Sequence, residues 1–346
     1  MLLLLEQCYT WLMPIFILAL GEDQLSEADL GAVQQALPSD FRFVQTTDEK
    51  KILSLAPAIE ICAGWFRPAW LQQMPTLRWA QFWGAGVNWV LDYPDLQERP
   101  FHLTNMSGVH AVPISEHIFG MLLYHGRSLH NAHNAQQART WARLKHPTEP
   151  LERPFSFSWQ QLNELGDKTM LLLGVGAIGE RTAKLAQAFD MHVIGVRNNP
   201  AKSSPYVDEM VGPDQLLAVL PRADFVVSTV PSTPKTYQMM GAKEIAAMKP
   251  TAFFVNIGRG DTVDEAALTE ALQSKRILGA ALDVFDQEPL PEASPLWDLD
   301  NVLITSHYSG GSPRYHERAA AILLENLARF QRGKPLQNVI DKGKGY

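Results

Sequence analysis

The stretch TMLLLGVGAIGERTAKLAQAF, residues 169–189, decides the fold. It begins with the apolar run TMLLL, passes through Gly174, Gly176 and Gly179, and continues with a helical pattern over residues 177–188. In such a strand–turn–helix the first glycine permits a tight turn, the second lets a phosphate approach the backbone, and the third lets helix and strand pack closely. The helix N-terminus adds free N–H groups and a partial positive charge. The stretch therefore predicts the pyrophosphate-binding turn of a dinucleotide-binding domain.

The end of the next predicted strand, HVIGV (192–196), indicates which dinucleotide is bound. An acidic residue that bonds the ribose 2′-hydroxyl is expected about 20 residues after the turn. Arg197 and Asn198 stand there instead. Because arginine can pair with a 2′-phosphate through charge-assisted hydrogen bonds, we expect NADP(H). The alternative is that Arg197 is a solvated strand end and that the chain binds NAD(H).

Short apolar runs alternate with helical patterns along the whole chain, which is typical of βαβ units. The candidate strands after residue 168 are TMLLL (169–173), HVIGV (192–196), FVVST (225–229), AFFVN (252–256), LGAALDV (278–284) and NVLIT (301–305). Those before residue 100 are IFILAL, FRFV, IEICAG and RWAQFW. Near-continuous apolar runs suit parallel strands covered on both faces, so we predict an α/β protein with two doubly wound parallel-sheet domains.

The order of the elements indicates that one domain is inserted into the other. Between the two series we expect one long helix from about Ser115 and an extended arm or loop over residues 145–159, which contain three prolines. The helical pattern of residues 312–333 is expected to pack back on the first domain. The predicted domains are a discontinuous, flavodoxin-like substrate domain (1–109 and 308–346) and an inserted Rossmann domain (110–307).

Composition and charge exclude several classes of protein. With 346 residues, 46% apolar and 19% charged, the chain has the length and balance of a two-domain globular protein. The net charge of −7 and the absence of a long Lys/Arg run argue against a nucleic-acid partner. Two cysteines cannot form a disulfide framework, which suits a reducing cytoplasm. No metal site is predicted.

The uncharged run from Gln7 to Leu20 allows two interpretations. No basic residue precedes it, Glu6 separates it from the leucines at positions 2–5, and it is shorter than the roughly 20 residues that span a bilayer. We therefore expect a buried first strand, IFILAL, rather than a targeting or membrane segment. Residues 1–12 are then a misassigned start or a dispensable extension.

Three polar residues follow strands of the second series, at the edge where open α/β sheets bind ligands. They are Arg259 in VNIGRG, Glu288 in LDVFDQEPLP and His307 in LITSHYSGG. Reduction of a 2-oxo acid needs a cation that holds the carboxylate, a proton donor that titrates near neutrality, and a carboxylate that keeps this donor protonated. Each residue alone could be structural, as a surface ion pair, a loop acid or a core histidine. Together they favour a catalytic set.

The chain is similar to the D-isomer specific 2-hydroxyacid dehydrogenase family from Pro14 to Tyr346. The matching stretches are GAGVNWV, NMSGVHAVPISEHIF, LLLGVGAIGERTAKLAQAF, VPSTPKT, VNIGRG, ALDVFDQEPLP and the histidine segment. The interval from Arg259 to Glu288, 29 positions (288 − 259), matches that of the family. The closing VIDKGKGY resembles the glyoxylate/hydroxypyruvate reductase branch.

The resemblance implies roles for individual residues. Arg259 would anchor the substrate, His307 would act as acid and base, and Glu288 would be its partner. The backbone N–H groups of Ala85, Gly86 and Val87 would hold the substrate carboxylate. The residues expected to bind the cofactor are Gly174, Gly176, Ala177, Ile178, Gly179, Arg197, Asn198, Val230, Pro231, Thr236, Ile257, Gly258, Asp283 and Gly310.

The sequence also departs from the family pattern. Asn88 replaces a common acid after Gly-Val, Ser306 replaces a common proline before the histidine, and Tyr308-Ser309 replace small apolar residues. These changes surround the expected substrate site, so the particular 2-oxo acid cannot be inferred. Trp65 could cap that site or belong to the core.

Two function classes and one assembly follow from the resemblance. The first class is an enzyme that reduces a small 2-oxo acid, and the second is a dinucleotide-sensing interaction protein of the corepressor type. The long helix and the arm after it, with Trp141, indicate a homodimer.

Overall fold

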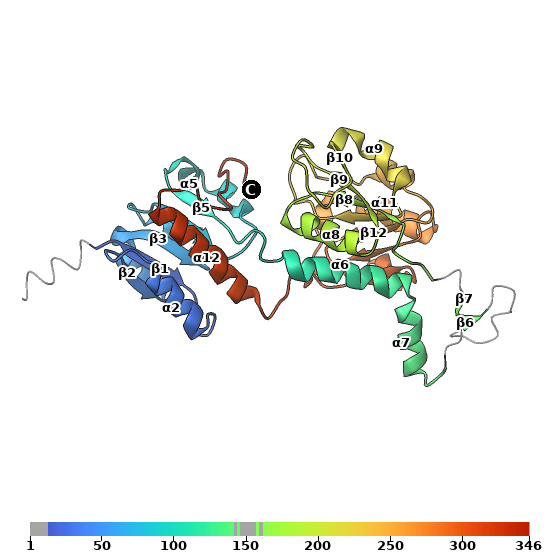
Figure 1. The fold of residues 1–346 in the computed structure, drawn as a ribbon, viewed down its shortest axis with the longest axis horizontal. Coiled ribbons are helices and arrows are strands. Elements are labelled where there is room, and N and C mark those ends of the chain that lie inside the picture. Colours follow the sequence, from blue (N-terminus) through green and yellow to red (C-terminus); the bar gives the residue numbers. More distant parts are fainter. Residues whose placement is uncertain (1–12, 142–143, 146–156, 159–161, 346) are drawn as a thin grey trace, which may run out of the picture. The chain divides into compact units, whose positions relative to one another are not determined.

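The computed structural model describes residues 13–141, 144–145, 157–158 and 162–345. The chain divides into two compact units: residues up to Val109 together with those from Ser312, and the segment His110–Gly311 (Figure 1). The chain therefore passes twice between the units. The second passage comes after Gly311 rather than after His307, because the backbone of Tyr308 and Ser309 is bonded to Asp283 of the second unit.

The first unit contains a five-stranded parallel sheet in the order β2-β1-β3-β4-β5, the flavodoxin-like order. Its strands are β1 (Ile15–Ala19), β2 (Arg42–Gln45), β3 (Ile59–Gly64), β4 (Trp79–Phe82) and β5 (His102–Thr104). Its helices are α2 (Glu27–Gln35), α3 (Glu49–Leu55), α4 (Pro68–Gln72), α5 (Pro94–Glu98) and α12 (Tyr315–Gln331). Short 3-10 helices lie at Ala56–Ala58 (η1) and Asn88–Asp92 (η2).

The apolar run of β1 is continuous because the strand is buried on both faces. Ile15 and Ile17 face the cluster that includes Ile52 and Leu71, whereas Phe16 and Leu18 face the opposite cluster. Side chains alternate between the two faces of a strand, so a run without polar residues is what burial on both faces requires. The run predicted to be the first strand is thus a strand; residues 1–12 lie outside the described part.

Helix α12 completes the first unit from the other end of the chain. Its residues Leu323 and Leu327 are fully buried in the cluster with Phe16 and Leu18. The buried Asn326 donates to Gln81 Oε1 of β4 over 2.9 Å, and α12 packs on α2. The C-terminal helix therefore packs within the first unit, as its amphipathic pattern indicates.

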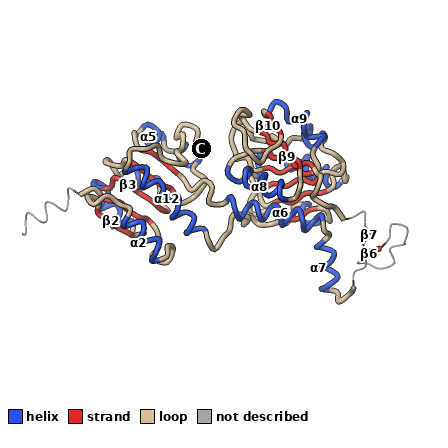
Figure 2. The backbone as a smooth tube through the Cα atoms, viewed as in Figure 1, coloured by secondary structure: helices blue, strands red, loops and turns tan. Residues whose placement is uncertain are grey.

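The second unit contains a seven-stranded parallel sheet in the order β10-β9-β8-β11-β12-β13-β14, whose first six strands have the Rossmann order. Figure 2 shows the strands of each sheet between helices. The strands are β8 (Thr169–Leu173), β9 (His192–Val196), β10 (Glu209–Val211), β11 (Phe225–Ser228), β12 (Phe253–Asn256), β13 (Gly279–Leu282) and β14 (Val302–Ile304). The short β6 (Leu144–Lys145) and β7 (Phe157–Ser158) pair with each other in parallel.

The helices of the second unit are α6 (Ala111–Gly126), α7 (Leu129–Gln137), α8 (Ala177–Ala188), α9 (Leu216–Val219), α10 (Ala242–Ala247) and α11 (Glu265–Gln273). Its 3-10 helices are η4 (Pro213–Gln215), η5 (Leu220–Arg222), η6 (Gly260–Thr262) and η7 (Pro295–Asp298). Both faces of β8 are buried: Met170 and Leu172 on the side of α6 and α8, Leu171 and Leu173 on the other.

The prediction of one long helix from about Ser115 was wrong, because the structure has two helices in this segment. Helix α6 begins four residues earlier, at Ala111, and ends at Gly126. Ser128 then has φ 55°, in the left-handed region, which ends the helix before α7 begins at Leu129. The apolar spacing continues across this break, so periodicity alone did not reveal it. Most of the predicted arm at 145–159 lies outside the described residues.

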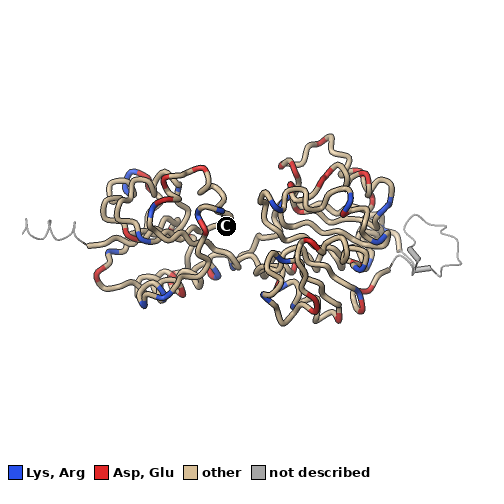
Figure 3. The backbone as a smooth tube through the Cα atoms, turned by 90° about the horizontal axis from the view of Figure 1, so that it is seen from above, with Lys and Arg blue, Asp and Glu red and all other residues tan. Residues whose placement is uncertain are grey.

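The described residues include no helix long and apolar enough to cross a membrane. The positions of acidic and of basic residues are interspersed along the backbone of both units (Figure 3). Cys62 is buried and free.

Candidate active site

The glycine turn between β8 and α8 has the geometry that a pyrophosphate needs. Gly174 has φ 91°, which favours glycine. A Cβ on Gly179 would lie 2.2 Å from the Gly174 carbonyl oxygen, so only glycine lets the helix start this close to the strand. A Cβ on Gly176 would meet nothing within 4 Å, and Gly176 is exposed. The open side of the turn at Gly176 fits the approach of a phosphate.

The other predicted cofactor residues of this sheet lie on neighbouring strand ends. Ala177 is exposed and Ile178 half-buried at the first turn of α8. Val230 and Ile257 are buried after β11 and β12. Gly258 packs against the loop of Val230, since a Cβ there would lie 2.6 Å from the Val230 carbonyl oxygen. Pro231 is exposed, and Thr236 ties the loop together by donating to its carbonyl oxygen over 2.6 Å.

Arg197 follows β9 at the predicted 2′-phosphate position. Its side chain is half-buried, and Nη1 donates to the Lys202 carbonyl oxygen over 3.4 Å, a long bond. Among the described residues no carboxylate pairs with Arg197. Asn198 beside it is exposed. This strand end therefore presents cationic and amide groups, which suit a phosphate better than a hydroxyl donor.

His307 and Glu288 are in direct contact. Nδ1 of His307 lies 2.6 Å from Glu288 Oε2, and Glu288 Oε1 accepts from the Phe285 N–H over 3.0 Å. Because a carboxylate only accepts, the Nδ1 atom carries the proton of this contact, and Nε2 faces away from it. Both side chains are partly exposed, at 49% and 36%. The pair therefore offers an oriented imidazole to a reactant.

Arg259 follows β12, the strand next to β13, and β13 in turn neighbours β14, after which His307 stands. Its guanidinium donates to the Gly258 carbonyl oxygen over 2.7 Å, and no carboxylate of the described residues forms an ion pair with it. Its backbone is fixed, since its carbonyl oxygen accepts from Asn256 and from the Thr262 hydroxyl. The residue is exposed and can bind an anion.

Asp283, predicted to line the cofactor, is fully buried. Oδ1 accepts from the Thr305 hydroxyl over 2.5 Å and from the Tyr308 N–H over 3.2 Å. Oδ2 accepts from the Ser309 N–H over 3.1 Å. The carboxylate is thus engaged with the loop that carries His307, a role that the sequence pattern did not indicate.

The sequence interpretation also missed two histidines near this loop. His110 lies with Nδ1 3.0 Å from the carbonyl oxygen of Gly310, a predicted cofactor residue. Burial lowers the pKa of His110, the bond to Gly310 opposes this shift, and the nearby Arg259 cation adds to it. His117 lies with Nε2 3.2 Å from Thr305 Oγ1. Nothing in the local pattern distinguishes these histidines, since both contacts join residues about 190 to 200 positions apart.

The predicted carboxylate turn, Ala85–Val87, belongs to the first unit and follows β4. Within the described residues no acceptor is bonded to the backbone amides of Ala85, Gly86 or Val87. The backbone of the turn is held by a side chain, because Asn105 Nδ2 donates to the Ala85 carbonyl oxygen over 2.5 Å. Asn88, a departure from the family pattern, begins the 3-10 helix η2.

Trp65 stands beside this turn. Its ring is 45% exposed and packs edge-on against Phe82 of β4, at 5.6 Å between ring centroids. A Cβ on Gly84 would lie 3.2 Å from the Trp65 ring, so the aromatic side chain packs close to the residue that precedes the turn. Of the two interpretations of Trp65, a purely core position does not fit this exposure.

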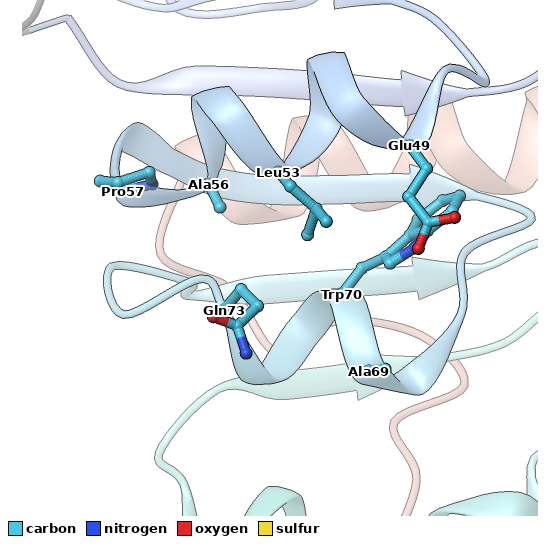
Figure 4. A pocket seen from close by; sticks show the side chains of 7 residues that line it. All are labelled: Glu49, Leu53, Ala56, Pro57, Ala69, Trp70 and Gln73. Carbon is cyan, nitrogen blue, oxygen red and sulfur yellow. The ribbon is translucent and has the colours of Figure 1, made fainter.

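A cavity of about 400 Å³ lies elsewhere on the first unit, between α3 and α4 (Figure 4). Glu49 lines it, and its carboxylate accepts from Trp70 Nε1 over 3.0 Å and from Arg67 over 3.1 Å. The polar groups of Glu49, Trp70 and Arg67 are therefore hydrogen-bonded to one another. None of the predicted site residues lines this cavity.

Known proteins resemble this chain in sequence and in fold. A sequence profile described as "D-isomer specific 2-hydroxyacid dehydrogenase, NAD binding domain" matches residues 119–309. A glyoxylate reductase of Korarchaeum cryptofilum is 30% identical over 271 residues, which are 78% of this chain and 77% of that protein.

Two solved structures are similar over nearly their whole length. A D-isomer specific 2-hydroxyacid dehydrogenase family protein from Aeromonas salmonicida has 30% identity and a TM-score of 0.76, over 95% of this chain and 99% of that one. An NADPH-dependent glyoxylate/hydroxypyruvate reductase from Sinorhizobium meliloti, in complex with NADP and sulfate, has 27% identity and a TM-score of 0.72, over 96% and 98%.

Proposed function

Because this chain belongs to the D-isomer specific 2-hydroxyacid dehydrogenase family, we propose that it uses NADPH to reduce a small 2-oxo acid of the glyoxylate or hydroxypyruvate type to the D-2-hydroxy acid. The observation that carries the proposal is the 2.6 Å contact between His307 and Glu288. This pair follows β13 and β14, next to the strand that Arg259 follows. A proton donor, its carboxylate and an anion-binding cation thus come from three adjacent strand ends.

His307 is the proton donor in this proposal. Glu288 accepts from Nδ1, which stabilises the protonated imidazole and leaves the Nε2 proton for the carbonyl oxygen of the substrate. Arg259 binds the substrate carboxylate and polarises the carbonyl, since guanidinium groups bind carboxylates in two-point geometry. NADPH, when bound, supplies the hydride. His307 gives up one proton per turnover and regains it from solvent. The 2-hydroxy acid product thus carries the hydride on the former carbonyl carbon and the proton on its oxygen.

The preference for NADPH rests on Arg197. No carboxylate of the described residues competes for its guanidinium, and its weak bond to the Lys202 carbonyl oxygen leaves it available. The S. meliloti relative, which is described as NADPH-dependent, supports the same choice. In this proposal Arg197 and Asn198 bind the 2′-phosphate, and the glycine turn binds the pyrophosphate.

The assembly that goes with the proposal is a homodimer formed through the segment after α6. Leu129 is 46% exposed and Trp141 is 83% exposed there, and large apolar side chains of this kind are typical of interfaces. Sedimentation should then give about twice the 38.6 kDa mass of the chain. The location is the cytoplasm, where the free Cys62 stays reduced.

Steady-state kinetics test the proposed function directly. Glyoxylate, hydroxypyruvate, pyruvate and phenylpyruvate are assayed with NADPH and with NADH. His307→Ala should lower kcat about 100-fold or more, the range for loss of a general acid. Arg259→Ala should weaken oxo-acid binding and turnover together.

The control is NADPH affinity, measured by fluorescence, which both variants should retain. No turnover of any of the four acids by the wild type would refute the proposed function. An equal loss of NADPH binding in both variants would assign structural roles to His307 and Arg259.

A further inference from the structure

A chain of polar contacts runs from helix α6 to the loop that carries His307. His117 Nε2 lies 3.2 Å from Thr305 Oγ1, and Thr305 Oγ1 lies 2.5 Å from Asp283 Oδ1. His117 comes from α6, Thr305 follows β14 and Asp283 follows β13. The ring of Tyr308 packs edge-on against His117, at 5.5 Å between ring centroids. Three separate elements therefore meet behind the loop.

The chemistry of the three groups fixes the direction of these hydrogen bonds. Both oxygens of Asp283 accept from backbone N–H groups, so the side chain acts as a carboxylate acceptor. The Thr305 hydroxyl has one proton and donates it to Asp283. Thr305 must then accept from His117, which places a proton on His117 Nε2. Burial lowers the pKa of His117 below its usual value, although Asp283 opposes the shift, so the neutral ring prevails at pH 7 and is the Nε2–H tautomer.

The far end of the chain of contacts holds the backbone at His307 in an unusual conformation. His307 has φ 53°, a left-handed conformation that costs a non-glycine residue about 1–2 kcal/mol. Its N–H donates to the Asp283 carbonyl oxygen over 2.9 Å, and the next two N–H groups donate to the Asp283 carboxylate. Asp283 therefore fixes three successive amides, and this directs the imidazole toward Glu288.

We infer that His117 and Thr305 are positioning residues for the proton donor His307, acting through the Asp283 carboxylate. The inference rests on the proposed function, because it takes His307 as the proton donor. Without the Thr305 hydroxyl, the Asp283 carboxylate loses one of its three hydrogen-bond donors. Without His117, the Thr305 hydroxyl is no longer held toward Asp283. Either loss loosens the loop at residues 307–309 and separates His307 from Glu288 for part of the time.

Paired variants test the chain of contacts. Thr305→Val removes the hydroxyl but keeps the shape, and Thr305→Ser restores it. His117→Leu removes the donor, and His117→Gln restores an N–H at a similar reach. The His117→Leu and Thr305→Val variants should each show kcat lowered about tenfold with KM for NADPH within about twofold, since the glycine turn is untouched. The restoring variants should recover most of kcat.

A double variant separates a connected chain of contacts from two independent effects. If both residues act through Asp283, His117→Leu combined with Thr305→Val should lower kcat no more than either change alone, because residues in one network are not additive. His125→Gln is the matched control on the same helix, where His125 stacks on Phe253 at 4.1 Å. It should leave kcat unchanged. Multiplicative losses in the double variant would overturn the inference.

Amide hydrogen exchange gives a readout that does not depend on turnover. Exchange at Tyr308 and Ser309 should speed up about tenfold in His117→Leu and Thr305→Val but not in His125→Gln. Nitrogen NMR should place the ring proton of His117 on Nε2 at pH 7.5. Unchanged exchange at both amides, or a proton on Nδ1, would overturn the inference even if the enzyme is active. Absence of turnover in the wild type would instead refute only the proposed function.

Discussion

Two turns of this protein are proposed to bind anions through backbone amides, and they are built in different ways. The turn at Gly174–Gly179 follows β8 and opens the 12-residue helix α8. The turn at Ala85–Val87 follows β4 and opens η2, a 3-10 helix of only five residues. Both follow the carboxyl end of a parallel strand, where ligands of such sheets bind. Only the first adds the dipole of a long helix to its amides.

The difference explains why one turn is easy to recognise in a sequence and the other is not. At Gly179 the Gly174 carbonyl oxygen excludes a Cβ, so the chain must place glycine there. The second turn needs three amides without acceptors, and every residue except proline has an amide. A position where a side chain does not fit requires glycine and can be recognised in the sequence. A backbone N–H donor can come from almost any residue and cannot be recognised in this way.

The largest expected effect comes from a methyl group at the sterically closed position. Gly179→Ala should weaken NADPH binding at least about 100-fold and lower the melting temperature by several degrees, because overpacking costs about 1–3 kcal/mol. Gly176→Ala is the matched variant, since its Cβ meets nothing within 4 Å. Gly176→Ala should have the melting temperature of the wild type, and its affinity for NADPH should be about tenfold lower because the methyl group blocks the pyrophosphate. Calorimetry and fluorescence titration measure both; an equal loss of stability in the two variants would contradict the steric explanation.

A proline tests the second turn, because it removes one amide proton. Gly86→Pro should raise KM for the oxo acid about 10-fold or more, as a hydrogen bond to a charged group contributes about 1.5–3 kcal/mol. NADPH affinity should stay the same. Gly86→Ala keeps the amide and serves as the control. If Gly86→Pro folds, binds NADPH and keeps its KM for the oxo acid, the carboxylate is bound elsewhere.

The smallest effect concerns the strand end beside the first turn. Arg197→Asp should remove a preference for NADPH over NADH of about tenfold in kcat/KM, equivalent to about 1.4 kcal/mol. The substituted carboxylate would repel the 2′-phosphate and accept from a 2′-hydroxyl. Kinetics with both cofactors at a saturating oxo-acid concentration measure it. A wild type that prefers NADH would show that the phosphate is not bound by Arg197.

Much of the fold could be predicted from the sequence wherever the burial of an element determines its pattern of apolar residues. The strands at 169–173 and 192–196 match β8 and β9 residue for residue, because parallel strands covered on both faces need unbroken apolar runs. The short strands β5 and β10 were missed, since neither lies in an apolar run such as VLI, which marks the equally short β14. The break at Ser128 depends on a backbone angle and not on hydrophobicity.

The candidate site also contains residues that could be predicted from the sequence and residues that could not. Arg259, Glu288 and His307 could be identified because each follows an apolar strand, and strand order then brings the three strand ends together. The contacts of His110 and His117 could not, because they join residues that are distant in sequence and carry no local signal. Asp283 was identified, but its bonds to the His307 loop come only from tertiary structure.

The discontinuity of the first unit has a consequence for synthesis on the ribosome. The ends of the inserted unit meet, since His110 contacts Gly310, so the segment His110–Gly311 can close as soon as it has emerged. The first unit cannot be completed until α12 has been synthesised, because Leu323 and Leu327 of α12 cover the face of β1 that carries Phe16 and Leu18. The domain that is translated first is thus the last to be completed. During that interval its apolar face is open to chaperones or to aggregation, as exposed surface in folding intermediates generally is.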